Sequence, residues 1–274
     1  MDVAPHALER LSRLRLDFWG TTVDALLQSS ADLAHFSYYF QDHRRTETSG
    51  PADFEIAFTA ESEAFTDGST DTLRSIFLRT PELDWSCYEK YRGAARKPSP
   101  LPPFSFPPLS GMVRTVHASA ASAPWAPGQA VLLHGPSLAG KSVLLLELLR
   151  AGWGFVSDDT VPIERERRLL SYRRPIGVRE RTLDVHPWLR PFLAEAPSFR
   201  TPTGTTWAVH PAALPVRRAP ERTEWAWTVV LSPAAEFELQ RIGEHSWRLA
   251  FDPARHARQA VAELSTTLTA STGT

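Results

Sequence analysis

The sequence has little of what marks a secreted or membrane-spanning protein. It contains one cysteine, Cys87, so no internal disulfide can form, and this usage is typical of a reducing cytoplasm. Its longest apolar run, residues 143–149, contains Glu147 and is far too short to span a bilayer. The first residues lack the apolar core of a secretory signal. We therefore expect a soluble, cytoplasmic protein with no membrane partner.

An excess of basic charge is also missing. The chain carries 30 Lys and Arg residues against 31 Asp and Glu residues, which gives no electrostatic reason to expect nucleic acid as a partner. Its 274 residues are enough for a substantial core in one or two domains.

Proline is plentiful, and its densest cluster divides the chain. Residues 97–109 contain repeated prolines, which fix φ and remove donors, so this stretch is neither helix nor central strand. We predict an N-terminal α+β domain over residues 1–96, a proline-rich linker or strap over 97–110, and a second domain over 111–274. The segment is either a recognition peptide for a partner or an ordered strap, and its apolar Phe104, Phe106 and Leu109 favour the strap.

The N-terminal part shows strand and helix patterns without catalytic motifs. Apolar and polar residues alternate from Leu14 to Phe18 and again from Phe54 to Phe58, which predicts two half-buried strands. Between them apolar residues recur at helical spacing behind Ser30, a plausible helix cap. We interpret this part as a scaffold or an acceptor-docking module.

The most informative motif is a glycine-bearing run that fits G-x-x-x-x-G-K-[ST] between an apolar stretch and a helix-like stretch. In such a loop the glycines let backbone N–H groups face an anion, and the helix dipole adds positive potential. Lysine then reaches the outer phosphates and the hydroxyl binds magnesium. The alternative is an ordinary turn between a strand and a helix. The run consists of Gly135, Pro136, Ser137, Leu138, Ala139, Gly140, Lys141 and Ser142.

Two adjacent carboxylates follow the loop closely. Asp158 lies seventeen residues after Lys141, at the end of a short apolar strand, and Asp159 is next to it. Strand, loop, helix and strand form one βαβ unit, which brings the loop and the aspartates to the carboxyl edge of a sheet. Because side chains alternate along a strand, the two carboxylates are expected to act differently, one on a metal and one on an acceptor hydroxyl. A solvated turn is the alternative interpretation.

Residues 117–163 resemble the catalytic domain of HPr kinase/phosphorylase and the HprK-related kinases. The resemblance rests on His117 before the loop, the loop itself, a leucine-rich helix closed by Gly152, and the Val-Ser-Asp-Asp-Thr-Val segment at 156–161. It implies an α/β fold: a P-loop-containing, HPr-kinase-like C-terminal domain with a smaller α+β N-terminal domain. The chain departs from the family where Leu138 and Ala118 replace glycines.

The resemblance also implies roles for individual residues. It casts Asp158 as the base that takes the proton from an acceptor serine, with Asp159 supporting the metal or the base. Glu180 is the nearest counterpart of a family glutamate close to the metal, in an inexact match. His117 either lines the phosphate site or satisfies a local hydrogen bond. The implied cofactors are ATP and Mg²⁺.

The expected function is therefore ATP-dependent transfer of a phosphoryl group to an aliphatic hydroxyl, most plausibly a serine of a protein or of a precursor peptide. A kinase acting on a small molecule such as free serine is an alternative. So is a nucleotide-binding sensor without catalysis, and so is a nucleoside-triphosphate hydrolase. The family often forms oligomers, so a homo-oligomer is implied as well. The stretch from Phe199 to Thr206 is either a loop closing over a phosphate or acceptor, or a plain surface loop.

Overall fold

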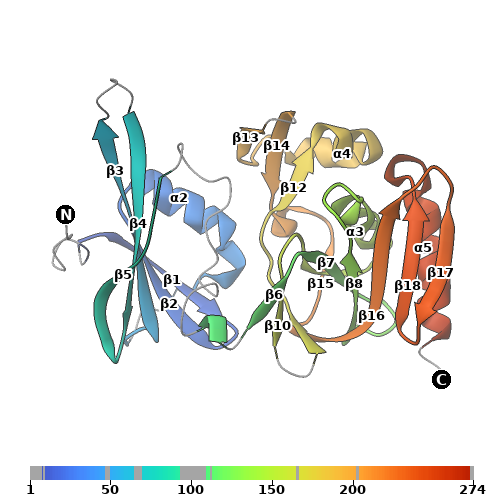
Figure 1. The fold of residues 1–274 in the computed structure, drawn as a ribbon, viewed down its shortest axis with the longest axis horizontal. Coiled ribbons are helices and arrows are strands. Elements are labelled where there is room, and N and C mark those ends of the chain that lie inside the picture. Colours follow the sequence, from blue (N-terminus) through green and yellow to red (C-terminus); the bar gives the residue numbers. More distant parts are fainter. Residues whose placement is uncertain are drawn as a thin grey trace. The chain divides into compact units, whose positions relative to one another are not determined.

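The computed structural model describes residues 8, 10–46, 50–64, 70–92, 109–111, 113–164, 167–201 and 204–271. The chain divides into two compact units, Met1–Gly111 and Met112–Thr274, each with its own sheets and helices in a mixed α/β arrangement (Figure 1). The proline-rich residues 97–108, interpreted above as a linker or strap, lie outside the described residues.

The first unit contains a five-stranded sheet in the order β1-β2-β3-β4-β5, as far as the chain is described. Strands β2 and β3 are parallel and the other neighbours are antiparallel. Its elements are β1 (Ser12–Phe18), β2 (Thr21–Leu27), α2 (Ser30–Tyr39), η1 (Gln41–His43), β3 (Phe54–Ala64), β4 (Thr70–Thr80), β5 (Leu83–Arg92) and η3 (Leu109–Gly111).

The patterns that predicted two strands and a helix in this unit are confirmed. Leu14, Leu16 and Phe18 are buried in β1, because their alternation places them on one face of the sheet. Helix α2 begins one residue earlier than expected: the side chain of Ser29, not Ser30, caps it by accepting a hydrogen bond from Asp32 N–H.

A buried ion pair lies within the sheet of this unit. Arg15, between Leu14 and Leu16, is also buried, because it pairs with Asp24 of β2. The Nε–Oδ1 distance is 2.6 Å and the Nη2–Oδ2 distance is 2.7 Å, so the guanidinium binds the carboxylate through both oxygens. The hydrogen bond to Asp24 raises the pKa of Arg15.

The second unit is built on a sheet in the order β15-β9-β7-β8-β16-β11-β10-β6, with β18 and β17 continuing from β16. Its strands are β6 (Arg114–Val116), β7 (Ala118–Ser122), β8 (Gln129–His134), β9 (Gly154–Ser157), β10 (Val161–Glu164), β11 (Arg168–Leu170), β15 (Arg217–Arg218), β16 (Arg222–Pro233), β17 (Glu238–Gly243) and β18 (Ser246–Phe251). Strand β7 lies antiparallel to both β8 and β9, so those two strands run in the same direction on either side of it.

Two helices cover one face of this sheet, α3 (Lys141–Arg150) and α5 (Pro253–Ala270) (Figure 1). Helix α5 starts directly after Asp252, because the Asp252 side chain accepts a hydrogen bond from Ala254 N–H and proline follows at the first helical position. Its apolar stripe, which includes Val261, Leu264 and Leu268, packs into the same core as the leucines of α3. In the described residues no helix combines the length and hydropathy needed to cross a bilayer.

A second, three-stranded sheet in the order β12-β14-β13 completes the unit. The stretch from Phe199 to Thr206 was expected as a loop, but its described residues 199–201 and 204–206 lie in the antiparallel strands β13 and β14, where Phe199 pairs with Thr206. Aromatic and β-branched residues such as these two favour paired strands. The remaining elements are β12 (Ile176–Arg179), α4 (Glu180–Val185), η5 (Pro187–Phe192), β13 (Ser198–Thr201), β14 (Gly204–Val209) and η6 (Pro211–Ala213).

Candidate functional site

The glycine loop, residues 135–140, connects β8 to α3 at the carboxyl end of β8. A Cβ on Gly135 would lie 2.8 Å from the carbonyl oxygen of Leu231, and one on Gly140 would lie 2.5 Å from Pro253 Cγ. Gly140 also has a φ of 92°. Glycine is therefore required at both ends of the loop, which is fixed against β16 and the start of α5.

The apex of the loop is a tight turn. Ala139 N–H donates to Pro136 O at 3.2 Å, and Leu138, the third residue of the turn, has a φ of 69°. Glycine or asparagine is usual at such a position. Leucine thus adopts a backbone conformation that favours glycine, and its side chain is exposed.

Lys141 folds back onto this loop. Its Nζ donates to Gly135 O at 2.8 Å and to Pro136 O at 3.0 Å, and the residue is buried. Burial lowers the pKa of Lys141, and the negative charges of Asp158 and Asp159 oppose that shift. The ammonium therefore lies inside the loop and close to the aspartate pair.

Asp158 is buried just beyond the end of β9 and is held by two hydroxyl groups. Ser119 Oγ donates to its Oδ1 at 2.6 Å, and Ser142 Oγ lies 3.1 Å from Oδ1 and 3.0 Å from Oδ2. Only 3% of Asp158 is exposed, and this burial raises the pKa of its carboxyl group against the lowering effects of both serines and Arg174. Within the described residues no cationic nitrogen lies within ion-pair distance of it.

Asp159 has the opposite surroundings. Its φ is 65°, and 51% of its side chain is exposed. Its Oδ1 lies 3.2 Å from His117 Nδ1, a ring nitrogen that is also 2.9 Å from the Asp159 carbonyl oxygen. Its Oδ2 lies 3.3 Å from Arg174 Nη1. The two neighbouring carboxylates thus differ in burial and in partners. Hydroxyl groups contact Asp158, whereas the His117 ring and the Arg174 guanidinium contact Asp159.

Strand β7 explains how residues distant in sequence reach this site. It is inserted antiparallel between β8 and β9, with Ala118 opposite His134 and Ala120 opposite Ser157. Its first residues therefore lie at the edge where β8 and β9 end, which brings His117 and Ser119 to the aspartates. Sequence reasoning missed Ser119, although a serine in a strand of alanines was a signal, and it missed Arg174, for which we find no signal.

Glu180 is the site candidate that the described contacts do not join to the others. It is the first residue of α4, and its carboxylate lies against Gly204, where a Cβ would be 3.3 Å from Oε2. In the part of the chain that the structure describes, no three His, Cys, Asp or Glu side chains are arranged to hold a metal ion. The structure thus brings together Lys141, Ser142, His117, Asp158 and Asp159, and it places Glu180 beside the β13–β14 hairpin.

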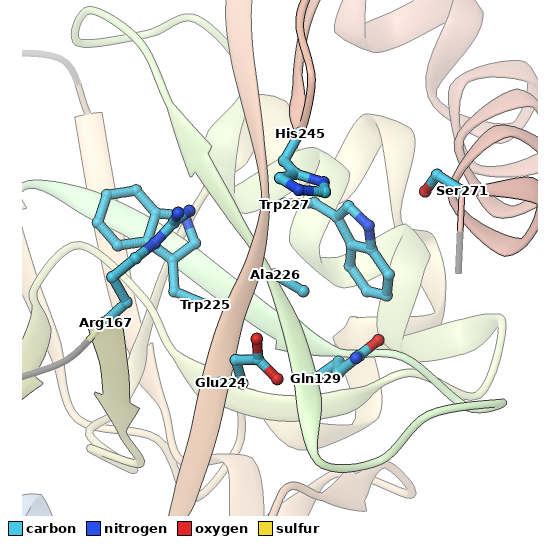
Figure 2. A pocket seen from close by; sticks show the side chains of 8 residues that line it. All are labelled: Gln129, Arg167, Glu224, Trp225, Ala226, Trp227, His245 and Ser271. Atoms are coloured by element: carbon cyan, nitrogen blue, oxygen red, sulfur yellow. The ribbon is translucent and has the colours of Figure 1, made fainter. Parts of the chain in front are cut away.

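A separate hollow lies at the other end of β8. Figure 2 shows the side chains around it, among them Gln129, Glu224, Trp225 and Trp227. Its volume is about 250 Å³, and it contains none of the residues of the glycine loop or the aspartate pair. Gln129 is the first residue of β8 and the glycine loop follows the last, so the hollow and the candidate site are at opposite ends of that strand.

No protein-family model matches the chain, and no curated protein sequence matches it either. Among solved structures, the chain is similar to the Hpr(Ser) kinase/phosphatase from Coxiella burnetii, at 15% sequence identity and a TM-score of 0.34. The similarity covers 59% of this chain and 99% of that one. These values indicate a distant similarity of fold and assign no reaction to the chain.

Proposed function

We propose that this chain is an ATP- and Mg²⁺-dependent kinase that transfers the γ-phosphoryl group to an aliphatic hydroxyl, a serine of a protein or of a precursor peptide. The observation that carries the proposal is the convergence of Lys141, Ser142 and Asp158. A glycine loop, a lysine inside it and a serine on a buried carboxylate are the parts that phosphoryl transfer requires for positioning and charge stabilisation.

The side chains present fit both cofactors. Magnesium takes oxygen ligands and usually keeps only one or two carboxylates beside the substrate phosphates and waters, so a three-carboxylate cluster is not needed. Ser142 and Asp158 offer such oxygens at the start of α3. Asp158 supports this further, because its buried carboxylate is hydrogen-bonded by two hydroxyl groups and has no cation in direct contact among the described residues, so it can take a bound cation. Bound magnesium would neutralise charge on the phosphates.

Lys141 and the loop amides would hold the triphosphate. The Lys141 ammonium is hydrogen-bonded to two loop carbonyl oxygens, which a bound phosphate would replace with a stronger, charge-assisted partner. The backbone N–H groups at the start of α3 add the positive end of the helix dipole.

The surroundings of the aspartates support a division of labour that reverses the one implied by the family resemblance. Asp158 faces Ser142 and is closed to an acceptor, so we assign it to the metal side. Asp159 is half exposed, so we assign it to the acceptor side, beside His117. In this scheme the acceptor oxygen bonds to the γ-phosphorus while the bond to the β,γ-bridging oxygen breaks. The hydroxyl proton passes to an Asp159 carboxylate oxygen and ADP leaves.

The decisive experiment measures MgATP binding by calorimetry and transfer of labelled γ-phosphate to serine-containing peptides and free serine. Lys141→Ala should weaken MgATP binding and abolish transfer, whereas Arg258→Ala, which removes an exposed cation from α5, should leave both unchanged. Equal MgATP affinity in wild type and Lys141→Ala would refute the proposal. Tight binding without transfer to any acceptor would identify a nucleotide sensor instead.

The division of labour is tested by Asp158→Asn and Asp159→Asn. We expect Asp159→Asn to lower turnover about a hundredfold at unchanged MgATP affinity, as loss of a general base does. Asp158→Asn should raise the magnesium concentration needed for ATP binding. The opposite pattern would restore the roles that the family resemblance implies.

A further inference from the structure

Leu138 combines two features that are unfavourable for an unliganded protein. Its φ of 69° is a left-handed conformation that is unfavourable for an ordinary L-residue. The residue is 55% exposed, more than any other large apolar residue in the described chain. A glycine or asparagine would fit the same turn without strain and without exposed apolar surface.

Its neighbourhood limits what this side chain can contact. Leu138 lies at the apex of the loop whose glycines, Lys141 and helix start are proposed to hold a triphosphate. Next to it Ala139 is buried in the core, so the loop turns one side chain inward and the other outward. Phosphate oxygens offer nothing to an aliphatic side chain, so its partner is an uncharged part of the ligand.

Among the described residues of the second unit, no other exposed large apolar side chain lies near the loop. Within the described residues of the second unit, the other exposed large apolar side chain is Ile242. It precedes the β17–β18 turn that carries His245, a residue of the hollow at the far end of β8 (Figure 2). In the proposed function the nucleoside is attached to the phosphates that the loop holds, whereas an acceptor approaches the aspartates that follow β9.

We propose that Leu138 packs against the nucleoside of the bound nucleotide and contributes to its affinity. The inference rests on the proposed function, since it requires a nucleotide in the loop. An aliphatic side chain recognises a flat apolar face and cannot read the donors and acceptors on a base edge. Leu138 therefore favours nucleoside triphosphates in general over bare polyphosphate, without distinguishing adenine from guanine.

The test compares binding of MgATP, MgGTP and magnesium tripolyphosphate to wild type, Leu138→Asn and Leu138→Met by calorimetry. Asparagine tolerates the left-handed turn and removes the apolar contact, while methionine keeps an apolar side chain of similar size. Leu138→Asn should bind MgATP and MgGTP about five- to tenfold more weakly, as expected for partial loss of one leucine contact, and bind tripolyphosphate like wild type. Leu138→Met should remain within about twofold of wild type for all three, as volume-conserving apolar replacements usually do.

Two results would overturn the contact while leaving the kinase proposal intact. Equal loss for MgATP and tripolyphosphate would show that the substitution disturbs the loop backbone. Unchanged nucleotide binding with weakened use of a serine peptide would assign Leu138 to the acceptor. Failure of wild type to bind either nucleotide or tripolyphosphate would instead refute the proposed function and the contact with it.

Discussion

Each unit of this protein buries an aspartate next to a β-strand, and the two are compensated in opposite ways. In the first unit Asp24 is 1% exposed and is bound through both oxygens by Arg15. In the second, Asp158 is 3% exposed and receives hydrogen bonds from Ser119 and Ser142. Asp24 has a counter-charge in direct contact with both carboxylate oxygens. Asp158 has no ion-pair partner in contact among the described residues, and Lys141 and Arg174 act on it only from a greater distance.

The difference agrees with our proposal that Asp158 binds a cation, whereas Asp24 stabilises the fold. A buried charge without a counter-ion in contact is unfavourable, which is why burial raises the pKa of Asp158. Perturbed groups of this kind concentrate at functional sites. The contrast between the two aspartates therefore predicts opposite responses to the same substitution.

The largest change in the free energy of unfolding is expected for Asp24→Asn. It leaves the buried Arg15 guanidinium without a counter-charge, which should destabilise the first unit by about 3–5 kcal/mol. Hydrogen exchange resolved by peptide should show faster exchange in β1 and β2 and unchanged exchange in α3. Asp84→Asn, at an exposed position, is the control and should change little. A loss below about 1 kcal/mol would show that the ion pair is replaceable.

Asp158→Asn should change the free energy of unfolding in the opposite direction from Asp24→Asn. Because the pKa of Asp158 is raised in the folded state, ionisation opposes folding, so the amide should stabilise the second unit at pH 7. The stability advantage of the amide should be absent below the ordinary aspartate pKa near 3.8, should grow as pH rises from there to the raised value, and should then level off. Urea unfolding of both proteins at several pH values measures it. Destabilisation at pH 7 would mean that the fold compensates this charge after all.

A smaller, pH-dependent change in the free energy of unfolding is expected from His186, which follows α4 and contacts α3. Its Nε2 lies 2.9 Å from Val143 O, and burial lowers its pKa, opposed by Val143 and Glu147 and reinforced by Arg150 and Arg258. Protonation therefore opposes folding, and the stability contributed by neutral His186 should be lost as pH falls from about 6.5 toward the lowered value. We expect a loss below about 1 kcal/mol between pH 6.5 and 5.5.

The measurement for His186 is urea unfolding across this pH range. His186→Gln, which cannot titrate, should lack this part of the pH dependence, whereas His245→Gln, at an exposed histidine, should retain it. An unchanged pH profile in His186→Gln would contradict the assignment.

Local patterns predicted the parts of the site that lie close together in the sequence. The glycine loop with its strand and helix, and the short strand before Asp158, follow from spacing and periodicity, and both elements are present. The contacts that distinguish the two aspartates were not predictable, because they depend on strand order. Nothing in the sequence says that β7 lies between β8 and β9, and that insertion alone brings Ser119 to Asp158. The Arg15–Asp24 pair was not predictable either, because it depends on the pairing of β1 with β2. The alternation in β1 alone predicts an exposed arginine at position 15.

The central position of β7 has a consequence for dissecting this protein. Five residues, Ala118–Ser122, fill the space between two strands that come later in the chain, and they carry the hydroxyl that holds Asp158. A fragment that begins after residue 122 would therefore contain the whole glycine loop and both aspartates, yet its sheet would be split between β8 and β9. The boundary of an autonomous fragment that carries the candidate site is therefore set by this short strand, upstream of the glycine loop and of both aspartates.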